Sequence, residues 1–303
     1  MTTLQDGRNI GYAILKETEN TSAYPLVLMD SLINMAQSSI CSGSVQDLLQ
    51  GNTIEKWPLP FLYSDAFYST VQDEQLDGDT IIWATTLDLS WTSSLATSGK
   101  LWINGNIITY TGKIATEVTG VTGILFNHES GTRVSQLFTL PSDYHTSVRI
   151  NYNNQYNLKS VDYRNLFTQL DQYKNTWVSW EGYNRYAFSS SISPFYTIIQ
   201  WQYLLPFQLD YTGKMLRMLY EKKATKMTVW TDVFTIPEDY ADIVPYLAVW
   251  EFLYNRWEEG RALELLKFAY GKIREMYTYY NNTNSEDIYN TRITTGKDQT
   301  FNI

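Results

Sequence analysis

The clearest pattern of hydrophobic positions lies in the C-terminal third of the chain. Residues 238–257 are apolar on nearly all sides, which predicts a helix buried on more than one face and kinked at Pro245. After Gly260, apolar residues recur at i, i+3, i+4 and i+7 as far as Tyr280. That spacing predicts an amphipathic helix of about 20 residues. The same spacing predicts a helix over residues 25–41.

A period-two pattern takes over between residues 78 and 141, and it begins with an alternation over residues 80–87 that predicts a strand. Two apolar runs, residues 100–103 and 107–111, flank Asn104-Gly105, which is the strongest short signal for a β-hairpin. Six of the chain's 16 glycines fall within 33 residues of this stretch, at turn-like intervals. We therefore expect a compact antiparallel β-domain, barrel-like or sandwich-like, that ends near Pro141.

Helical patterns on both sides of the β-region predict an α+β fold: an α-helical bundle body with an inserted antiparallel β-domain and extended terminal arms. A further helix is expected over residues 161–180, followed by an irregular aromatic stretch over 182–213. The expected segments are an N-terminal arm (1–24), a helical body (25–50 and 142–281) with a β-hairpin near 215–230, a linker with the inserted β-domain (51–141), and a C-terminal tail (282–303).

The chain is unusually aromatic, with 10 Trp, 24 Tyr and 12 Phe. These numbers exceed what a core of this size needs. Tyr and Trp combine apolar area with a polar group and suit surfaces that become buried on assembly. The alternative is a Tyr-rich β-protein with aromatic side chains on half-buried strands. The candidate assembly contacts are Trp57, Phe61, Tyr246, Trp250, Trp257, Tyr277 and Tyr280.

The net charge of −9, from 32 acidic and 23 basic residues, argues against tight or sequence-reading binding of nucleic acid. An acidic wall past which DNA slides is compatible with this charge. One basic stretch, with Lys222, Lys223 and Lys226, is a candidate for contact with a phosphate backbone or with an acidic partner. Its alternative interpretation is a solvated hairpin tip.

The single cysteine, Cys41, excludes an intrachain disulfide and a thiolate metal cluster. Its apolar surroundings in the sequence predict a buried thiol. No basic-then-apolar signal segment opens the chain, and no run approaches 18 apolar residues. We expect a soluble protein that is made in the cytosol and has no membrane partner.

The sequence contains no recognisable catalytic motif. Ser130, His128 and Asp143 are the residue types of a catalytic triad, but nothing in their spacing selects them. Glycine-rich phosphate loops and His or Cys pairs with zinc spacing are both missing. We predict no catalytic, cofactor-binding or metal-binding residues, no cofactor, and no enzymatic activity. Glu251 is the lone charge in an apolar run, with Arg256 and Arg261 close in the sequence. We expect an ion pair within or between subunits, with Arg256 as the candidate partner, the alternative being an acid or base in a cleft.

Two regions resemble proteins of the tailed-bacteriophage neck. Residues 102–113 (WINGNIITYTGK), 119–123 (TGVTG) and 128–134 (HESGTRV) are similar to the β-domain of phage neck proteins. Residues 236–259, with IPEDY, VPYLA and RWEE, resemble the helical part of phage head-to-tail connector (adaptor) proteins. The next helix, which ends in MYTYY at 276–280, resembles it as well. Together these regions cover about half of the chain.

In that family the subunits form a ring, typically twelvefold, beneath the portal. The ring extends the DNA channel and offers a platform for the tail. The resemblance implies a virion structural protein of the neck, assembled in the host cytoplasm. Its partners would be copies of itself, the portal protein, and tail or further neck proteins, with non-specific passage of DNA. It also implies that the helical body makes the ring and that the β-domain projects from it.

Two other functions remain open at the sequence level. One is a tail-fibre or baseplate module whose exposed Trp and Tyr side chains stack on host-surface glycans. The other is a glycosidase that uses carboxylates such as Asp73, Glu129 or Glu251, which would have to lie about 5–9.5 Å apart across a cleft.

Overall fold

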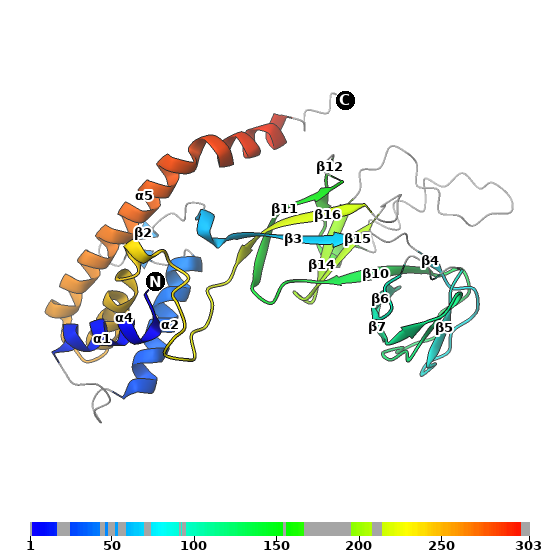
Figure 1. Ribbon diagram of the computed structural model, residues 1–303, viewed down its shortest axis with the longest axis horizontal. Coiled ribbons are helices and arrows are strands. Elements are labelled where there is room, and N and C mark those ends of the chain that lie inside the picture. Colours follow the sequence, from blue (N-terminus) through cyan, green and yellow to red (C-terminus); the bar gives the residue numbers. More distant parts are fainter. Residues whose placement is uncertain are drawn as a thin grey trace. The chain divides into compact units, whose positions relative to one another are not determined.

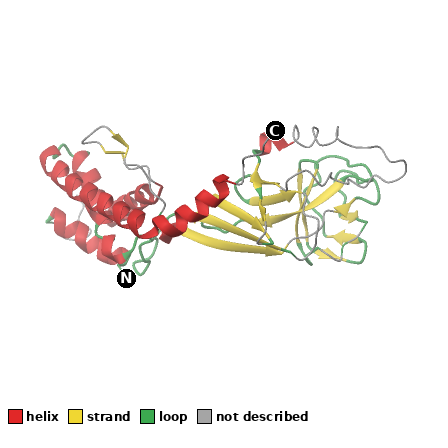
Figure 2. Ribbon diagram, turned by 90° about the horizontal axis from the view of Figure 1, so that it is seen from above, coloured by secondary structure: helices red, strands yellow, loops and turns green. Residues whose placement is uncertain are grey.

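The computed structural model describes residues 2–16, 25–42, 46–47, 52–53, 59–69, 74–90, 92, 95–153, 156–166, 195–207 and 214–297. It has an α+β fold, and the chain divides into two compact units (Figure 1). The helical unit comprises Met1–Ser64 and Glu221–Ile303, and the β unit comprises Asp65–Tyr220. The β unit is thus inserted, in chain order, into the helical unit. Figure 2 shows that the helices, in red, and most of the strands, in yellow, belong to different units.

The helical unit is built around one central helix, α4. This helix packs against α1, α2 and α5, because buried apolar residues surround it on almost every side. Two 3-10 turns and a short antiparallel strand pair complete the described part of the unit. The elements are α1 (Leu4–Leu15), α2 (Leu26–Ser42), β1 (Gln46–Asp47), β2 (Asn52–Thr53), η1 (Pro60–Leu62), η2 (Glu238–Tyr240), α4 (Ile243–Tyr254) and α5 (Glu259–Lys297).

Helix predictions from apolar spacing are confirmed for α2 and for the first part of α5, whose buried stripe runs from Ala262 to Tyr277. The predicted kink at Pro245 is wrong. The helix begins at Ile243, so Pro245 lies in its first turn, where a missing N–H disrupts no intrahelical hydrogen bond. The predicted helix splits instead into η2 and α4.

The predicted N-terminal arm is wrong over residues 4–15, which form α1. Thr3 and Asp6 form a capping box at its start: the Thr3 N–H donates to Asp6 Oδ2 at 2.8 Å, and the Asp6 N–H donates to Thr3 Oγ1 at 3.3 Å. Gly7 lets the helix approach closely, since a β-carbon there would lie 2.7 Å from the Phe234 ring. Residues 282–297 of the expected C-terminal tail continue helix α5, and residues 298–303 lie outside the described part.

The β unit consists of short strands in three sheets. Their orders are β13-β14-β15-β10-β6-β7, with β4 also on β10; β12-β11-β16-β3; and β5-β9-β8. The strands are β3 (Tyr63–Ser69), β4 (Glu74–Gln75), β5 (Thr86–Asp88), β6 (Gly99–Ile103), β7 (Asn106–Tyr110), β8 (Gly112–Lys113), β9 (Glu117–Thr119), β10 (Arg133–Thr139), β11 (Tyr144–Tyr152), β12 (Tyr156–Asn157), β13 (Lys159–Ser160), β14 (Phe195–Ile199), β15 (Tyr203–Phe207) and β16 (Met215–Lys222).

Strand β10 belongs to two parts of the β unit. Its first residues pair with β4 and β6, and its last residues pair with β15. Residues 74–134, which we call the small lobe, enclose a core of their own that includes Leu89, Ile103 and Ile108. The predicted hairpin at Asn104-Gly105 is confirmed: it joins β6 to β7, and both turn residues have positive φ, 44° and 97°.

Several boundaries of the β-region differ from expectation. The β unit extends to Tyr220, so much of the segment assigned to a helical body is strand. The hairpin expected near residues 215–230 is a single strand, β16, between β11 and β3. The irregular stretch 182–213 contains the hairpin β14–β15. Of the helix expected over 161–180, residues 163–166 are helical and 167–180 lie outside the described part.

The closed barrel allowed for the β-domain does not occur among the described strands, which form open sheets. Short strands and frequent turns in the sequence do not distinguish a barrel from several small sheets. None of the described helices combines the length and the apolar character needed to span a lipid bilayer.

Candidate assembly surfaces

Four tryptophans of the described chain are largely exposed to solvent. The exposed fractions are 77% for Trp83, 76% for Trp201, 62% for Trp230 and 86% for Trp257. Three of these four, all except Trp230, have positive φ: 67°, 57° and 67° in chain order. The left-handed region costs an L-residue about 1–2 kcal/mol, and a bulky side chain there is uncommon. Because little of each indole is buried within its own chain, intrachain packing does little to offset that cost.

Trp257 lies in the turn that follows helix α4 (Ile243–Tyr254). Its N–H donates to the carbonyl of Tyr254 at 3.1 Å, and the N–H of Glu258 donates to the carbonyl of Leu253 at 3.1 Å. These two bonds define a Schellman motif, in which the residue at the Trp257 position is normally Gly or Asn. A Gly would close the helix with no strain, so the helix end itself does not require an indole.

Trp83 and Trp201 occupy equivalent positions in two tight turns. The Ala84 N–H donates to the Ile81 carbonyl at 3.1 Å, which makes Trp83 the third residue of its turn. That position requires positive φ in a type II turn and is usually Gly or Asn. The β14–β15 turn holds both Gln200 (φ 53°) and Trp201 at positive φ, where hairpins favour Asn-Gly. The strain therefore recurs in three unrelated turns.

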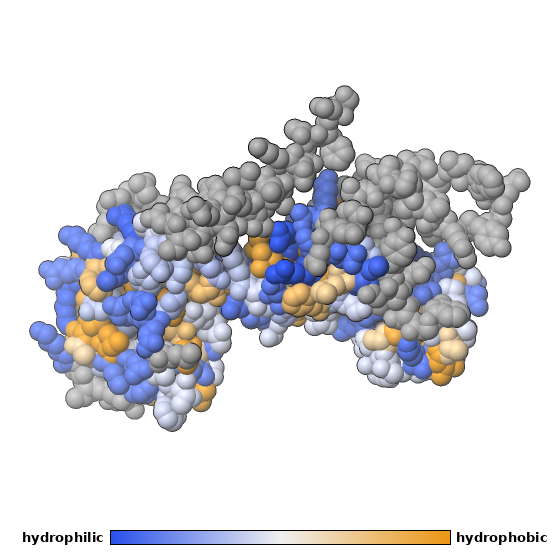
Figure 3. Space-filling model, turned by 45° about the horizontal axis from the view of Figure 1, so that its top comes forward, coloured by the Kyte–Doolittle hydropathy of each residue, from blue (hydrophilic) through white to orange (hydrophobic). Residues whose placement is uncertain are grey.

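The helical unit also carries a row of aromatic side chains, which we call the aromatic face: Tyr246, Trp250 and Tyr254 at four-residue intervals on α4, and Phe268 on α5. The rings of Tyr246 and Phe268 are 4.3 Å apart, and those of Trp250 and Tyr254 are 6.0 Å apart. Tyr254 and Phe268 are 52% and 40% exposed. Trp250 Nε1 is buried without a hydrogen-bond partner among the described residues. Hydrophobic side chains are visible on the surface in Figure 3.

The structure separates the predicted assembly contacts into two groups. Tyr246, Trp250 and Trp257 lie at or near the surface of the helical unit and stay candidates. Tyr277 is instead a core residue: it is buried, and its hydroxyl donates to the Ile40 carbonyl at 3.1 Å. The half-buried rings of Phe61 and Tyr280 pack on each other at 5.5 Å and contact the same core. Trp57 lies outside the described residues.

The expected ion pair between Glu251 and Arg256 does not form among the described side chains. Residues five apart on a helix do not face each other, and the Arg256 guanidinium lies over the Phe252 ring, 4.6 Å from its centroid. Burial alone raises the pKa of Glu251. A neighbouring guanidinium would lower that pKa, so the shift agrees with the geometry.

The predicted basic turn follows strand β16. Lys222 is the last residue of β16, and Lys223 and Lys226 are exposed in a segment without regular secondary structure. We call residues 222–232 the Trp230 loop. Because β16 has no hairpin partner beyond Lys222, the interpretation of this segment as a hairpin tip is wrong.

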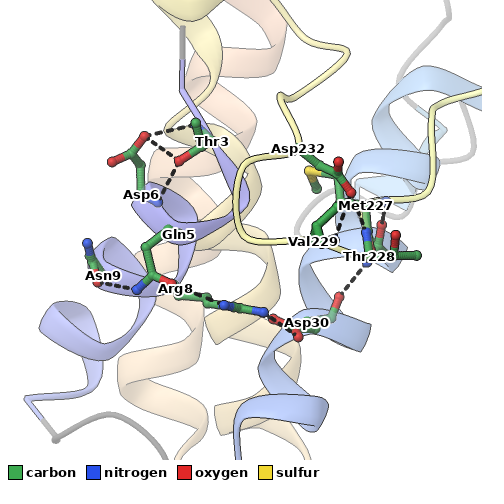
Figure 4. A network of polar contacts seen from close by, with 11 residues as sticks. Thr3, Gln5, Asp6, Arg8, Asn9, Asp30, Met227, Thr228, Val229 and Asp232 are labelled. Carbon is green, nitrogen blue, oxygen red and sulfur yellow. Dashed lines mark hydrogen bonds and ion pairs between the residues drawn. The ribbon is translucent and has the colours of Figure 1, made fainter.

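The Trp230 loop is held firmly against α1 and α2 (Figure 4). Asn34 on α2 accepts from the Met227 N–H at 2.8 Å and donates to the Met227 carbonyl at 3.0 Å. The Asp232 carboxylate accepts the N–H groups of Thr228 and Val229 at 2.6 and 2.9 Å. The N–H of Leu4 donates to the Asp232 carbonyl at 2.8 Å. Trp230 is thus exposed on a fixed backbone.

A second apolar surface lies on the small lobe. We define the Trp83 patch as Ile81, Ile82, Trp83, Leu125 and Phe126, which are between 41% and 77% exposed. The patch lies where a strand was expected from the alternation over residues 80–87, of which only the end became β5. The sequence offered no signal that the apolar run 81–83 would face solvent.

Hydrogen bonds join the two loops of the patch. Thr80 and His128 exchange two backbone bonds of 2.7 and 2.8 Å, and the Ile82 N–H donates to Asn127 Oδ1 at 2.8 Å. The Ser130 N–H donates to Asp79 Oδ1 at 2.8 Å. Both loops are therefore fixed, and the patch is a preformed surface.

His128 lies beneath the patch. Its ring is buried, with Nε2 2.9 Å from Asn106 Nδ2 and the Phe126 ring 5.0 Å away, centroid to centroid. Burial lowers the pKa of His128. A neutral imidazole accepts the Asn106 amide in this geometry, so the histidine is a structural residue of the lobe.

No triad is assembled from Ser130, His128 and Asp143. Asp143 accepts the Tyr220 hydroxyl at 2.9 Å, whereas His128 contacts Asn106. Within the described ranges, no group of three or more His, Cys, Asp or Glu residues is placed to hold a metal ion. Cys41 is buried. Of the three carboxylates considered for glycosidase chemistry, Asp73 lies outside the described residues.

No protein-family model matches the chain, and no curated protein sequence matches it.

Proposed function

We propose that this chain is a structural assembly subunit, and that it forms an oligomeric ring of the head-to-tail connector in a tailed bacteriophage. The observation that carries the proposal is the set of exposed tryptophans held in left-handed turns. Three such positions cost about 3–6 kcal/mol together, a large share of the 5–15 kcal/mol that stabilises a typical domain. A partner that covers the indoles accounts for their presence.

Tryptophan is the residue type most enriched at the energetic centres of protein interfaces. An indole on a tight turn or a helix end projects from a short, hydrogen-bonded backbone, so little conformational entropy is lost when a partner binds. The aromatic face of α4 and α5 adds a broader surface of the same chemistry. These features support binding to protein surfaces.

A closed ring requires two different, complementary surfaces on each subunit. The helical unit and the β unit each carry exposed apolar groups, which are candidates for the two surfaces. The placement in a phage neck rests on the resemblance of residues 102–134 and 236–280 to connector proteins. The net charge of −9 suits a channel wall that DNA passes without binding.

The test is negative-stain microscopy and light scattering of the purified chain, alone and mixed with its portal protein. Rings, or density on the tail-side face of the portal, support the proposal. A strict monomer that ignores the portal and binds glycans on an array contradicts it and supports the glycan-binding alternative. A variant with Asn at positions 83, 201 and 257 is the matched control and should not assemble.

A further inference from the structure

Acidic residues occur in the segments that form the Trp83 patch. The two segments that form and support it, residues 74–99 and 114–132, contain six carboxylates, and the basic residues nearest to them in the sequence are Lys100, Lys113 and Arg133. Asp77 and Glu129 are exposed. The patch therefore combines large apolar side chains with negative charge on a fixed backbone.

The Trp230 loop has the opposite character. Residues 222–232 contain three Lys and a single acidic residue, Asp232, whose carboxylate accepts the N–H groups of Thr228 and Val229. Val229 and Trp230 are 52% and 62% exposed beside them. The hydrogen bonds from Asn34 and Asp232 fix this backbone as well.

We propose that the Trp83 patch binds the Trp230 loop of a second copy of this chain. This inference rests on the proposed ring function and specifies one of its contacts. Each surface has an apolar centre, and their charges are opposite, which favours their encounter and fixes their register. Both are preformed, so docking orders little additional backbone. The occupant is a second copy because the chain itself carries the complementary surface.

The contact is heterologous, since the patch and the loop are different surfaces of one subunit. Each subunit can therefore bind one neighbour through its patch and another through its loop. A heterologous contact repeated in this way either closes into a ring or continues as a filament. A two-fold symmetric dimer would require the same surface on both copies and is not expected.

Charge reversal on either surface provides the test. One variant carries Asp77→Lys and Glu129→Lys in the small lobe; the other carries Lys223→Glu and Lys226→Glu in the loop. Each should weaken self-association by about 100-fold or more, because like charges then face each other. The side chains reversed are on the surface, so each variant should fold, which circular dichroism and thermal unfolding check.

An equimolar mixture of the two variants should assemble again. The reversed patch of one variant attracts the reversed loop of the other, and their unchanged surfaces also attract, which gives rings of alternating subunits. Lys159→Glu, an exposed charge reversal elsewhere in the β unit, should leave assembly unchanged. Light scattering and negative-stain microscopy measure all four samples.

The outcomes separate this inference from the function on which it rests. Rings of the unmodified chain that persist in both reversal variants overturn the patch–loop contact and leave the ring function standing. The same holds if each variant fails to assemble and the mixture fails as well. An unmodified chain that stays monomeric with and without the portal overturns both.

Discussion

Replacing Trp257 by Asn should stabilise the isolated subunit and weaken its assembly. Asn adopts the left-handed conformation readily, so the substitution relieves the strain at the end of α4. A side chain important to its own fold would show the reverse. The two effects have opposite signs, which makes this substitution more informative than a loss of function alone.

The change in the free energy of unfolding of the isolated subunit follows from the exposed fraction of the Trp257 side chain. At 86% exposure, Trp257 buries roughly 35 Å² of a side chain of about 250 Å². That burial contributes about 0.9 kcal/mol at 25 cal/mol per Å². Relief of the positive φ returns about 1–2 kcal/mol. We expect the free energy of unfolding to rise by about 0–1 kcal/mol. The association constant of the subunits should fall by at least about 30-fold, which is the effect of losing an interface tryptophan that contributes about 2 kcal/mol to binding.

Urea unfolding at a concentration where the chain is monomeric measures the first effect, and light scattering over a concentration series measures the second. Trp230→Asn is the matched control for strain: it removes an exposed tryptophan whose φ is not positive, so it should not stabilise the subunit. A Trp257→Asn variant that unfolds more easily by over 1 kcal/mol and assembles normally would show that Trp257 serves its own fold and not an interface.

Three further experiments, with four substitutions, test the account of the fold. Asp30→Ala removes the ion-pair partner of Arg8, whose side chain is 9% exposed and lies 2.6 Å from Asp30. Because Asp30 is 25% exposed, we expect urea unfolding to show a decrease of about 2–3 kcal/mol in the free energy of unfolding. Asp162→Ala, which removes an exposed ion pair, should change it little. Burial raises the pKa of Glu251. Its contribution to the free energy of unfolding is therefore fully present below the pKa of the unfolded chain and is lost as the pH rises through the pKa of the folded chain. Glu251→Gln should remove this loss and stabilise the protein at pH 7, and an unchanged pH profile of the free energy of unfolding contradicts this. Burial lowers the pKa of His128. Its contribution to the free energy of unfolding is therefore present above the pKa of the unfolded chain, near 6.5, and is lost as the pH falls through the pKa of the folded chain. Hydrogen exchange of the small lobe should increase on acidification, and an identical response of a His128→Gln variant would show that another group is responsible.

Periodicity predicted the parts of the fold where one chemical pattern extends over several turns or pairs. Helix α2, the buried stripe of α5 and the Asn104-Gly105 hairpin all follow from local spacing. Helix α1 was missed because its buried face includes Gly7 and Gly11, which carry no apolar side chain. Its packing against Phe234 depends on a segment more than 200 residues away in the sequence, which local patterns cannot reveal.

The candidate surfaces were only partly predictable. The sequence identified Tyr246, Trp250 and Trp257 as assembly residues because they are aromatic. It also selected Tyr277, since an amphipathic helix pattern does not distinguish a side chain on the core from one on a partner. The lysines of the Trp230 loop were noted, but their neighbour Trp230 was not. Its exposure depends on hydrogen bonds from Asn34 and Asp232 that only the folded chain brings together.

The strained tryptophans suggest how such surfaces could be recognised without a relative. At Trp257 two hydrogen bonds, and at Trp83 one hydrogen bond together with the positive φ, define a position that Gly or Asn would occupy at lower cost. Strain of this kind persists where function requires it, and the exposure of the indoles excludes packing within the chain as a sufficient reason. Both observations are geometric, and neither depends on the resemblance to connector proteins. The assembly role and the neck location therefore rest on independent grounds. An experiment that disproves the neck location leaves the assembly role untouched, and the reverse also holds.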